Sequence, residues 1–307
     1  MKRLTAVILL ILFVIGFAYA ILKQPPGTSN RSAGSAGALV RVMTFNIRYD
    51  NPGDGENAWP NRIDFVASAI NFHKADIVGV QEALRHQVDE LAAWLPGFSW
   101  FGVGRDDGVD AGEFMAVFYR PERFDMLEHD TFWLSETPDK PGIGWDAACN
   151  RVVTWAKFRD TVDDREFYHF NTHFDHMGAT ARRESALLLL DRIAAIAGNF
   201  PVTVTGDFNS RPGDEPIRII LDGPSGDSSL RLYDTKVHSN HPHHGPSGTW
   251  SGFMSPGNPG DEPIDYIFFK NAVTVEYHGT LSDTFDGRFP SDHMPVLAEV
   301  RYGRTDK

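Results

Sequence analysis

The sequence has 307 residues, a formal net charge of −12, 42% hydrophobic residues and one cysteine. The apolar fraction is that of an ordinary globular protein, so the composition excludes a largely disordered chain. The acidic balance argues against a protein that binds nucleic acid through bulk positive charge. The single cysteine, Cys149, excludes an internal disulfide and a zinc site built from several cysteines.

The first 22 residues form an apolar segment behind two basic residues. This pattern is typical of an export signal, and Ala18-Tyr19-Ala20 has the small-x-small form of a cleavage site. The apolar run continues to Leu22 and is just long enough to span a bilayer as a helix. Residues 1–22 are therefore predicted to be either a cleaved signal peptide or an uncleaved membrane anchor. In both cases the rest of the chain is expected outside the cytoplasm, secreted, periplasmic or anchored to the membrane.

Residues 23–37 are rich in Pro, Gly and Ser and carry almost no large apolar side chain. This composition predicts a flexible linker. Residues 38–307 contain no further linker, repeat or low-complexity block, so we expect them to form one domain.

The apolar patterns of residues 38–307 predict more strands than helices. Strands are expected, in chain order, at 38–47, 76–80, 113–119, 151–158, 167–173, 201–205, 263–269 and 294–300. Helices are expected at 63–70, 84–95 and 181–197. Because several strands follow one another without an intervening helix, we expect layers with mixed sheets instead of a doubly wound parallel sheet.

Polar side chains stand at the ends of six of these apolar runs. They are Asn46, Glu82, His173, Asp207 with Asn209, Asp265, and Asp292 with His293. Strand ends are where sites assemble in layered sheet proteins, and hard oxygen ligands with few histidines favour Mg²⁺ or Mn²⁺ over zinc. This set is typical of metal-assisted hydrolysis of a phosphate ester.

The order of these motifs resembles that of the endonuclease/exonuclease/phosphatase superfamily, which has the DNase-I-like fold. The matching stretches are TFNIR (44–48), QE (81–82), NTHFDH (171–176), GDFN (206–209), IDYIF (264–268) and SDHMP (291–295). GEFMAVFYR (112–120) and GTWSGF (248–253) are similar to a bacterial branch of unassigned metal-dependent hydrolases. The resemblance implies an α+β fold, a four-layer α/β/β/α sandwich of two mixed β-sheets.

The resemblance also implies a role for each motif residue. The positions that hold or orient the divalent metal correspond to Asn46, Glu82 and Asp292. The catalytic positions correspond to His173, Asp207, Asn209, Asp265 and His293. Within this set, Asp265 would orient the His293 imidazole, and His173 would be a phosphate-facing acid or hydrogen-bond donor. The general base stays open between His293 and Asp207, in the second case with His293 contacting the phosphate.

Two arginines are candidates for substrate binding. Arg151 begins a predicted strand near the acidic motifs, where a buried arginine either clamps a phosphate or forms a structural ion pair. Arg48, two residues after Asn46, has the same two interpretations. One of Asp175 and His176 is also expected to reach the site.

Other conspicuous residues have plainer interpretations. The histidine-rich loop at 238–244 is interpreted as a rim that contacts substrate, in preference to a zinc site. Cys149 is expected to be a buried apolar residue and not a nucleophile. Four tryptophans are expected in the core or in walls instead of serving as stacking platforms. They are Trp133, Trp145, Trp155 and Trp250.

We therefore expect a metal-dependent phosphoesterase that cleaves phosphodiesters outside the cytoplasm with water activated by Mg²⁺ or Mn²⁺. Lipid, sugar and nucleotide phosphoesters remain competing substrates, and an extracellular nuclease of the same fold is the alternative. A non-catalytic binding protein is disfavoured because every motif position holds a chemically competent residue. The membrane is an expected partner if the leader stays uncleaved, and no protein partner is evident.

Overall fold

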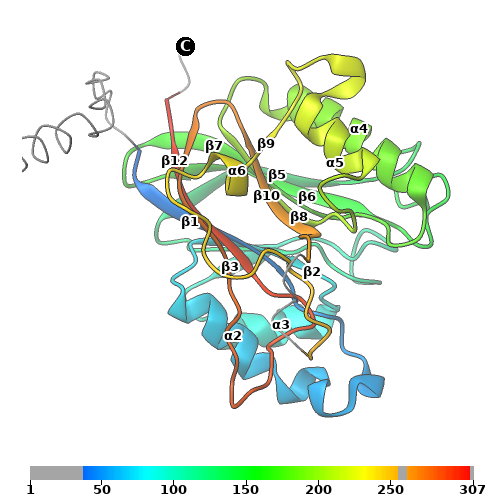
Figure 1. Ribbon diagram of the computed structural model, residues 1–307, viewed down its shortest axis with the longest axis vertical. Helices are drawn as coiled ribbons and strands as arrows, with labels where there is room; N and C mark the ends of the chain where they lie inside the picture. The colour runs from blue at the N-terminus through cyan, green and yellow to red at the C-terminus, as the bar shows by residue number, and fades with distance from the viewer. Residues whose placement is uncertain (1–36, 255–260, 305–307) are drawn as a thin grey trace, which may run out of the picture. The chain divides into compact units, whose positions relative to one another are not determined.

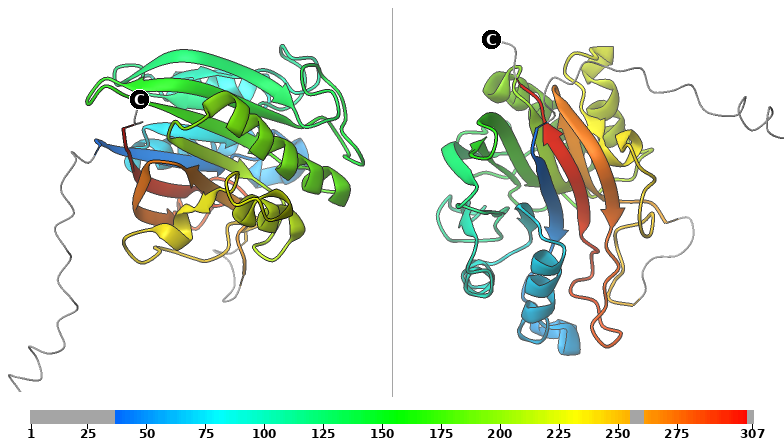
Figure 2. Two further views of the ribbon diagram at one scale, coloured as in Figure 1. Left: turned by 90° about the horizontal axis from the view of Figure 1, so that it is seen from above. Right: turned by 90° about the vertical axis from the view of Figure 1, so that its left-hand side faces the viewer.

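Two six-stranded mixed sheets lie face to face, with helices on their outer faces (Figures 1 and 2). The computed structural model describes residues 37–254 and 261–304. The leader and linker predicted at 1–22 and 23–37 thus lie outside the described residues, apart from Gly37. Within the described ranges, none of the helices combines the length and hydropathy that a membrane crossing demands. The predicted four-layer sandwich is confirmed.

The first sheet has the strand order β11-β12-β1-β2-β4-β3, with only β1 and β2 parallel. Its strands are β1 (Leu39–Asn46), β2 (Ile77–Gln81), β3 (Ser99–Phe101), β4 (Val117–Tyr119), β11 (Val273–Thr280) and β12 (Val296–Tyr302). Helices α2 (Ile63–Phe72) and α3 (Arg85–Trp94) cover its outer face, because their apolar sides share one core with β1, β2 and β4. Two short 3₁₀ helices, η1 (Pro52–Asn57) and η2 (Trp59–Asn61), lead into α2.

The second sheet has the order β5-β6-β7-β8-β10-β9, with β7 and β8 parallel. Its strands are β5 (Phe124–Trp133), β6 (Val152–Asp160), β7 (Arg165–His173), β8 (Val202–Asp207), β9 (Tyr233–Asp234) and β10 (Asp265–Lys270). Helices α4 (Ala179–Ala197) and α5 (Glu215–Asp222) pack on its outer face. The short helices η3 (Pro224–Gly226) and α6 (Thr235–His238) follow α5.

The space between the sheets changes character along the strands. Its apolar part includes Val42, Phe167 and Val300. Toward the ends that carry the predicted motifs it becomes polar, because Asn171 Oδ1 accepts hydrogen bonds from Gln81 Nε2 at 2.7 Å and Thr205 Oγ1 at 3.0 Å. The hydrogen bond from Gln81 of β2 to Asn171 of β7 runs from one sheet to the other, so it ties the two sheets together beneath the strand ends.

The elements predicted from the sequence are present, with shifted ends. The strand expected at 113–119 is shorter, because Phe114 leaves the sheet to form bridges with Ala83 and Gly104 before β4 begins at Val117. Strands β3, β5, β9 and β11 and helices α5 and α6 were not predicted.

Candidate active site

The register of the second sheet places three predicted residues in one row. The parallel pairing of β7 and β8 sets His173 beside Asp207, and the antiparallel pairing of β8 and β10 sets Asp207 beside Asp265. From the first sheet, Asn46 ends β1, and its Nδ2 donates to Asp207 Oδ2 at 3.0 Å. The ends of both sheets therefore converge on Asp207.

Glu82 follows β2 and is oriented by the same amide. Asn46 Nδ2 also donates to Glu82 Oε1 at 3.0 Å, and Tyr49 N donates to Glu82 Oε2 at 3.2 Å. Glu82 has a φ of 64°, in the left-handed region that non-glycine residues seldom adopt. The local turn thus directs the carboxylate away from the strand path and toward Asp207.

Asp265 and His293 form the predicted carboxylate–imidazole pair. His293 Nδ1 lies 2.9 Å from Asp265 Oδ2, which also accepts from Thr249 Oγ1 at 2.6 Å. His293 Nε2 is 3.8 Å from Asp207 Oδ2. Burial opposes the charged imidazole, but the carboxylates of Asp265 and Asp207 outweigh it and raise the pKa of His293 well above its usual value.

At Asp207, burial favours the raised pKa instead of opposing it. Burial and the neighbouring charge of Asp265 raise the pKa of Asp207 to about 7. Hydrogen bonds to the carboxylate from Asn209 N, at 2.8 Å, and from Asn46 only partly offset this effect. Asp207 is therefore a carboxyl group whose proton affinity is close to neutrality, which suits a group that accepts a proton during a reaction.

His173 is held as a neutral imidazole. Asn209 Nδ2 donates to His173 Nε2 at 2.9 Å, which places the ring proton on Nδ1. Burial and the positive charges of Arg151 and Arg105 lower the pKa of His173 well below its usual value. Nε2 thus accepts a hydrogen bond and orients Asn209, whereas Nδ1 is buried and has no hydrogen-bond partner among the described residues. A hydrogen bond from His173 to phosphate stays a prediction.

Arg48 forms structural ion pairs. Its Nε and Nη2 lie 3.0 and 3.2 Å from the two carboxylate oxygens of Asp54. Its guanidinium also lies 4.0 Å from Glu82 Oε2 and 3.8 Å from Asp292 Oδ2. Buried Arg62, which sequence reasoning missed, donates to Arg48 O at 2.7 Å and fixes this turn.

Arg151 is buried in the cavity wall, whereas Arg48 is only half-buried. It is 4% exposed, with Nε 3.3 Å from Asp175 Oδ1 and Nη2 2.9 Å from His176 Nδ1. Its Nη1 is buried and has no hydrogen-bond partner among the described residues. Because the side chain lines the cavity, this nitrogen is suited to an anionic ligand. Of the two interpretations of Arg151, the geometry favours the phosphate clamp.

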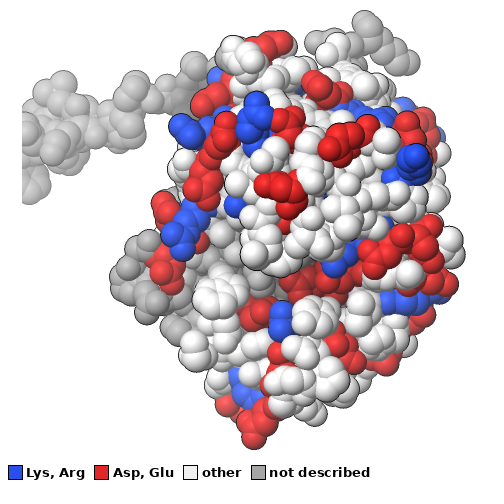
Figure 3. All heavy atoms as spheres, turned by 90° about the vertical axis from the view of Figure 1, so that its right-hand side faces the viewer, with Lys and Arg blue, Asp and Glu red and all other residues white. Residues whose placement is uncertain are grey.

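These side chains surround a cavity of about 450 Å³. Eight of the ten predicted site residues line it, and the other two, Asn46 and Asp265, contact Asp207 and His293 from behind. The wall also contains residues that were not predicted there, Tyr49, Arg105, Glu113 and Cys149, together with His176 and Trp250. The face in Figure 3 is hollowed across its middle, with acidic and basic side chains gathered along the hollow.

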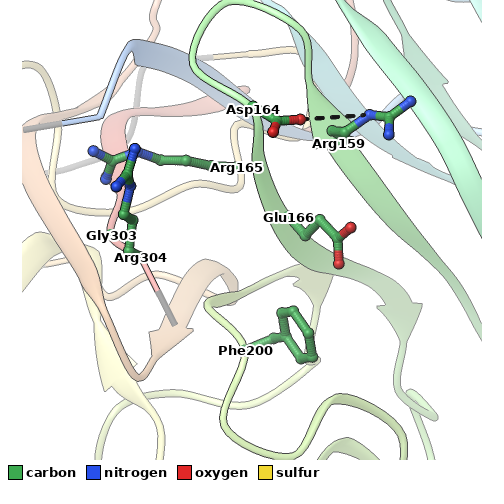
Figure 4. A pocket seen from close by; sticks show the side chains of 7 residues that line it. All are labelled: Arg159, Asp164, Arg165, Glu166, Phe200, Gly303 and Arg304. Carbon is green, nitrogen blue, oxygen red and sulfur yellow. Dashed lines mark ion pairs between the residues drawn. The ribbon is translucent and has the colours of Figure 1, made fainter. Parts of the chain in front are cut away.

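A larger hollow of about 640 Å³ lies elsewhere, between the turn after β6 and the end of β12 (Figure 4). Arg159 and Asp164 form an ion pair there at 3.9 Å, and Phe200 closes one side. None of the predicted catalytic residues lines it. The chemistry therefore belongs to the smaller cavity.

The donor set of the cavity fits a hard divalent cation. Ligand atoms of Glu82, His173 and Asp207 lie within 4.8 Å of one another. Glu82 and Asp292 both lie within 4.0 Å of the Arg48 guanidinium and both line the cavity, so the two carboxylates stand near each other there. Carboxylates that leave room for water are the ligands that Mg²⁺ and Mn²⁺ prefer. Glu82 and Asp292 are thus the residues that would hold the metal.

A model of the endonuclease/exonuclease/phosphatase family matches residues 43–293. The chain belongs to this family. An endonuclease/exonuclease/phosphatase from Bacteroides vulgatus is 40% identical, with a TM-score of 0.81 over 87% of this chain and 100% of that one. The Bacteroides thetaiotaomicron mannosyl-6-phosphatase Bt3783 is 36% identical, with a TM-score of 0.79 over 85% and 99%. An uncharacterised mimivirus protein, L388, is 28% identical over 78% of this chain and 91% of its own length.

The histidine-rich loop lies apart from the motif residues described above. Its His243 Nδ1 is 2.9 Å from His278 Nδ1 of β11, and His244 forms a bridge with Gly279. No residue of 238–244 lines the cavity, so the predicted rim contact is wrong. Among the described residues, each cluster of three close metal-ligating side chains lies in or beside the cavity, not in this loop.

Trp250 lies in a wall, one of the two places expected for it, whereas Cys149 is less buried than expected. Trp250 is 55% exposed and lines the cavity, where its backbone pairs with His293. Cys149 is partly exposed in the cavity wall, and burial raises the pKa of its thiol, which argues against a nucleophile as predicted.

Proposed function

We propose that the protein is a divalent-metal-dependent hydrolase of phosphoesters. The arrangement around Asp207 carries this proposal, because a proton acceptor, a charged imidazole and a pair of metal-type carboxylates open into one cavity. Mg²⁺ or Mn²⁺ held by Glu82 and Asp292 would supply Lewis-acid stabilisation of the phosphoryl group. Asn46 orients Glu82 for this task.

The division of proton roles follows from the local charges. Asp207 has a pKa raised toward neutrality, so it can take a proton from an attacking water. His293 is held charged by Asp265 and suits contact with a phosphate oxygen. Of the two alternatives from the sequence, we therefore favour Asp207 as the general base.

For the substrate we propose a sugar phosphomonoester. A relative 36% identical over nearly its whole length is a mannosyl-6-phosphatase. The cavity of about 450 Å³ has the size of a small-molecule site, and Arg105 and Arg151 in its wall complement the two negative charges of a monoester. Phosphodiesters, expected from the sequence, are the competing class that the assay must include.

The test is hydrolysis of mannose 6-phosphate, a generic phosphomonoester and a generic phosphodiester, each with Mg²⁺, with Mn²⁺ and with EDTA. We expect turnover of the monoesters that stops with EDTA and falls by at least a hundredfold in Asp207→Asn, because general-base catalysis typically contributes about 10²–10⁴ in rate. Asp164→Asn, which removes an exposed carboxylate in the far hollow of Figure 4, should leave the rate unchanged. Metal-independent turnover, or none on any substrate, would refute the proposal.

We also propose that the domain acts outside the cytoplasm. The support is the basic and apolar composition of residues 1–22. Residues 1–37 fused to a reporter that works only after export should give reporter activity, and the same fusion with the apolar run interrupted by two aspartates should not. Equal activity from both fusions would contradict export by this segment.

A further inference from the structure

A second hollow, of about 700 Å³, lies along the open side of the sandwich. There β3 is the last strand of one sheet and β5 the last strand of the other. Side chains of both edge strands line it, together with Trp155 of β6 and Arg192 and Ile196 of α4. The proposed reaction uses none of these residues.

Aromatic side chains dominate the lining of this groove. They are Trp100, Phe101, His129, Phe132, Trp133 and Trp155. Trp155 packs on Phe170 with ring centroids 6.1 Å apart, and Trp100 packs on Phe114 at 6.2 Å. Both tryptophans line the groove and are only half-buried, so packing holds each ring while part of its surface stays exposed. The negative face of such a ring attracts the slightly positive C–H groups of a sugar ring.

Hydrogen-bonding side chains stand among these rings. Asp130 and Thr131 project from β5, and Arg192 lies over the Phe132 ring and binds Asp139 Oδ1 at 2.7 Å. The groove thus has two carboxylates, those of Asp130 and Asp139, and one guanidinium, that of Arg192. This charge balance disfavours binding of a nucleic acid or another polyanion. Rigid aromatic surfaces with a few polar groups fit an uncharged polyhydroxyl ligand.

The groove and the reaction cavity share a wall. In the loop between β3 and β4, Arg105 lines the cavity, whereas Gly102, Val103 and Gly108 line the groove. The wall is fixed, because the Arg105 carbonyl accepts from Trp133 Nε1 at 2.7 Å and from Asn150 Nδ2 at 3.2 Å. A ligand with its phosphate in the cavity can therefore continue across this loop into the groove.

We propose that the groove binds uncharged sugar residues of the substrate, so that the substrate class is a phosphorylated neutral oligosaccharide. The identity of the substrate rests on the proposed function, whereas sugar binding in the groove does not. Binding is therefore tested first without phosphate, with mannotetraose as the probe and tryptophan fluorescence as the signal. We expect the tryptophan fluorescence of the full-length protein to change saturably as mannotetraose is added.

Two variants test whether the fluorescence change comes from binding in the groove. Trp155→Ala should weaken binding about tenfold, since an aromatic contact is worth roughly that factor. Trp94→Ala, which removes an exposed tryptophan of α3 outside the groove, should bind like the unmodified protein. If Trp155→Ala does not fold, the exposed rim variant Asp130→Ala replaces it, with weakened binding again expected.

Kinetics provide the second test. kcat/KM for mannotetraose phosphorylated at C6 of its terminal residue should exceed that for mannose 6-phosphate at least about tenfold. Trp155→Ala should remove this ratio, whereas Trp94→Ala, outside the groove, should keep it. Tetraose binding without turnover of either phosphate ester supports the groove and refutes only the proposed function. No saturable binding at about 10 mM probe, equal binding by Trp155→Ala, or capture of an extended peptide by β5 in place of the sugar would overturn the proposal.

Discussion

Arg151 presents a buried Nη1 without a partner, among the described residues, to the reaction cavity. A phosphate oxygen would satisfy this nitrogen with a charged hydrogen bond, which is worth about 1.5–3 kcal/mol. We therefore expect Arg151→Ala to lower kcat/KM for a phosphomonoester by about ten- to a hundredfold. Arg151→Lys should lie between, because it keeps the charge but loses the planar fork.

The matched control for Arg151 is Arg159→Ala, which removes an arginine on the far hollow of Figure 4 and should leave kcat/KM unchanged. Unfolding in urea should be measured for both, because Arg151 also contacts buried Asp175. Unchanged kcat/KM in Arg151→Ala would show that Arg151 is only a structural partner of Asp175.

Buried His169 makes stability depend on pH. Its ring nitrogens lie 3.0 Å from Thr203 Oγ1 and 3.2 Å from Thr205 Oγ1, and burial lowers its pKa from 6.5 to about 3. Between these values the unfolded chain binds a proton that the folded chain does not. The stability is therefore fully present above about pH 6.5 and decreases by about 1.4 kcal/mol per pH unit as the pH falls.

His169→Gln separates this effect from other titrations, because the amide keeps hydrogen-bonding groups but does not titrate. Urea unfolding at pH 7.5, 6 and 5 should show a shallower loss of stability in the variant, by about 1.4 kcal/mol per unit. A residual slope is expected, since burial also lowers the pKa of His278 to about 3. Identical slopes in both proteins would contradict the assignment.

At the scale of the elements, β2 approaches the opposite sheet most closely at Gly79. A Cβ at this position would collide with Thr205 Oγ1 and Asn171 Oδ1 of the opposite sheet, and Asn171 Oδ1 accepts the hydrogen bond from Gln81 that joins the two sheets. We expect Gly79→Ala to cost about 2–3 kcal/mol of unfolding free energy through overpacking. Activity should fall as well, because Asn171 and Thr205 lie two residues before His173 and Asp207.

Gly213→Ala is the control for Gly79, since a Cβ there has no neighbour within 4 Å. It should change the free energy of unfolding by no more than about 0.5 kcal/mol. Thermal and urea unfolding of the two variants provide the comparison, and equal stability of Gly79→Ala and the unmodified protein would mean that the sheets can separate at no cost.

The elements that the sequence predicted are those with a continuous buried face. Strand β2 is fully buried and apolar up to its last residue, whereas β5 is an edge strand whose middle residues are exposed and mostly polar. Its strand character comes from pairing with β6, including a bulge between Met126 and Glu128. The local sequence has no alternation of apolar and polar residues that would predict such a strand.

The residues of the candidate site also fall into those that the sequence predicted and those that it did not. Residues such as Asp207 and Asp265 stand at strand ends, so their motifs could be read from the sequence and their meeting follows from sheet register. Arg105 and Trp250 come from loops, and tertiary contacts fix the Arg105 backbone through Trp133 and Asn150. The spacing of residues in the sequence does not predict the paths of these two loops.

At the scale of the whole molecule, a small part of the acidic excess behind the net charge of −12 lies at the candidate site. Glu82, Asp207, Asp265 and Asp292 lie in or directly behind one cavity. On the face in Figure 3, acidic and basic side chains are interspersed and form no continuous basic band among the described residues. Such a surface offers little attraction to a nucleic-acid backbone, which is consistent with a small phosphoester as substrate.

The cluster of acids also predicts that a divalent cation stabilises the fold. A ligand that binds only the folded state adds about 2.7 kcal/mol at a hundred times its Kd, so Mg²⁺ or Mn²⁺ should raise the Tm by several degrees and EDTA should reverse the shift. Glu82→Gln should abolish most of this response, whereas Asp139→Asn, with its exposed carboxylate outside the cavity, should retain it. A response that survives in Glu82→Gln would place the cation elsewhere, because these carboxylates would then not hold it.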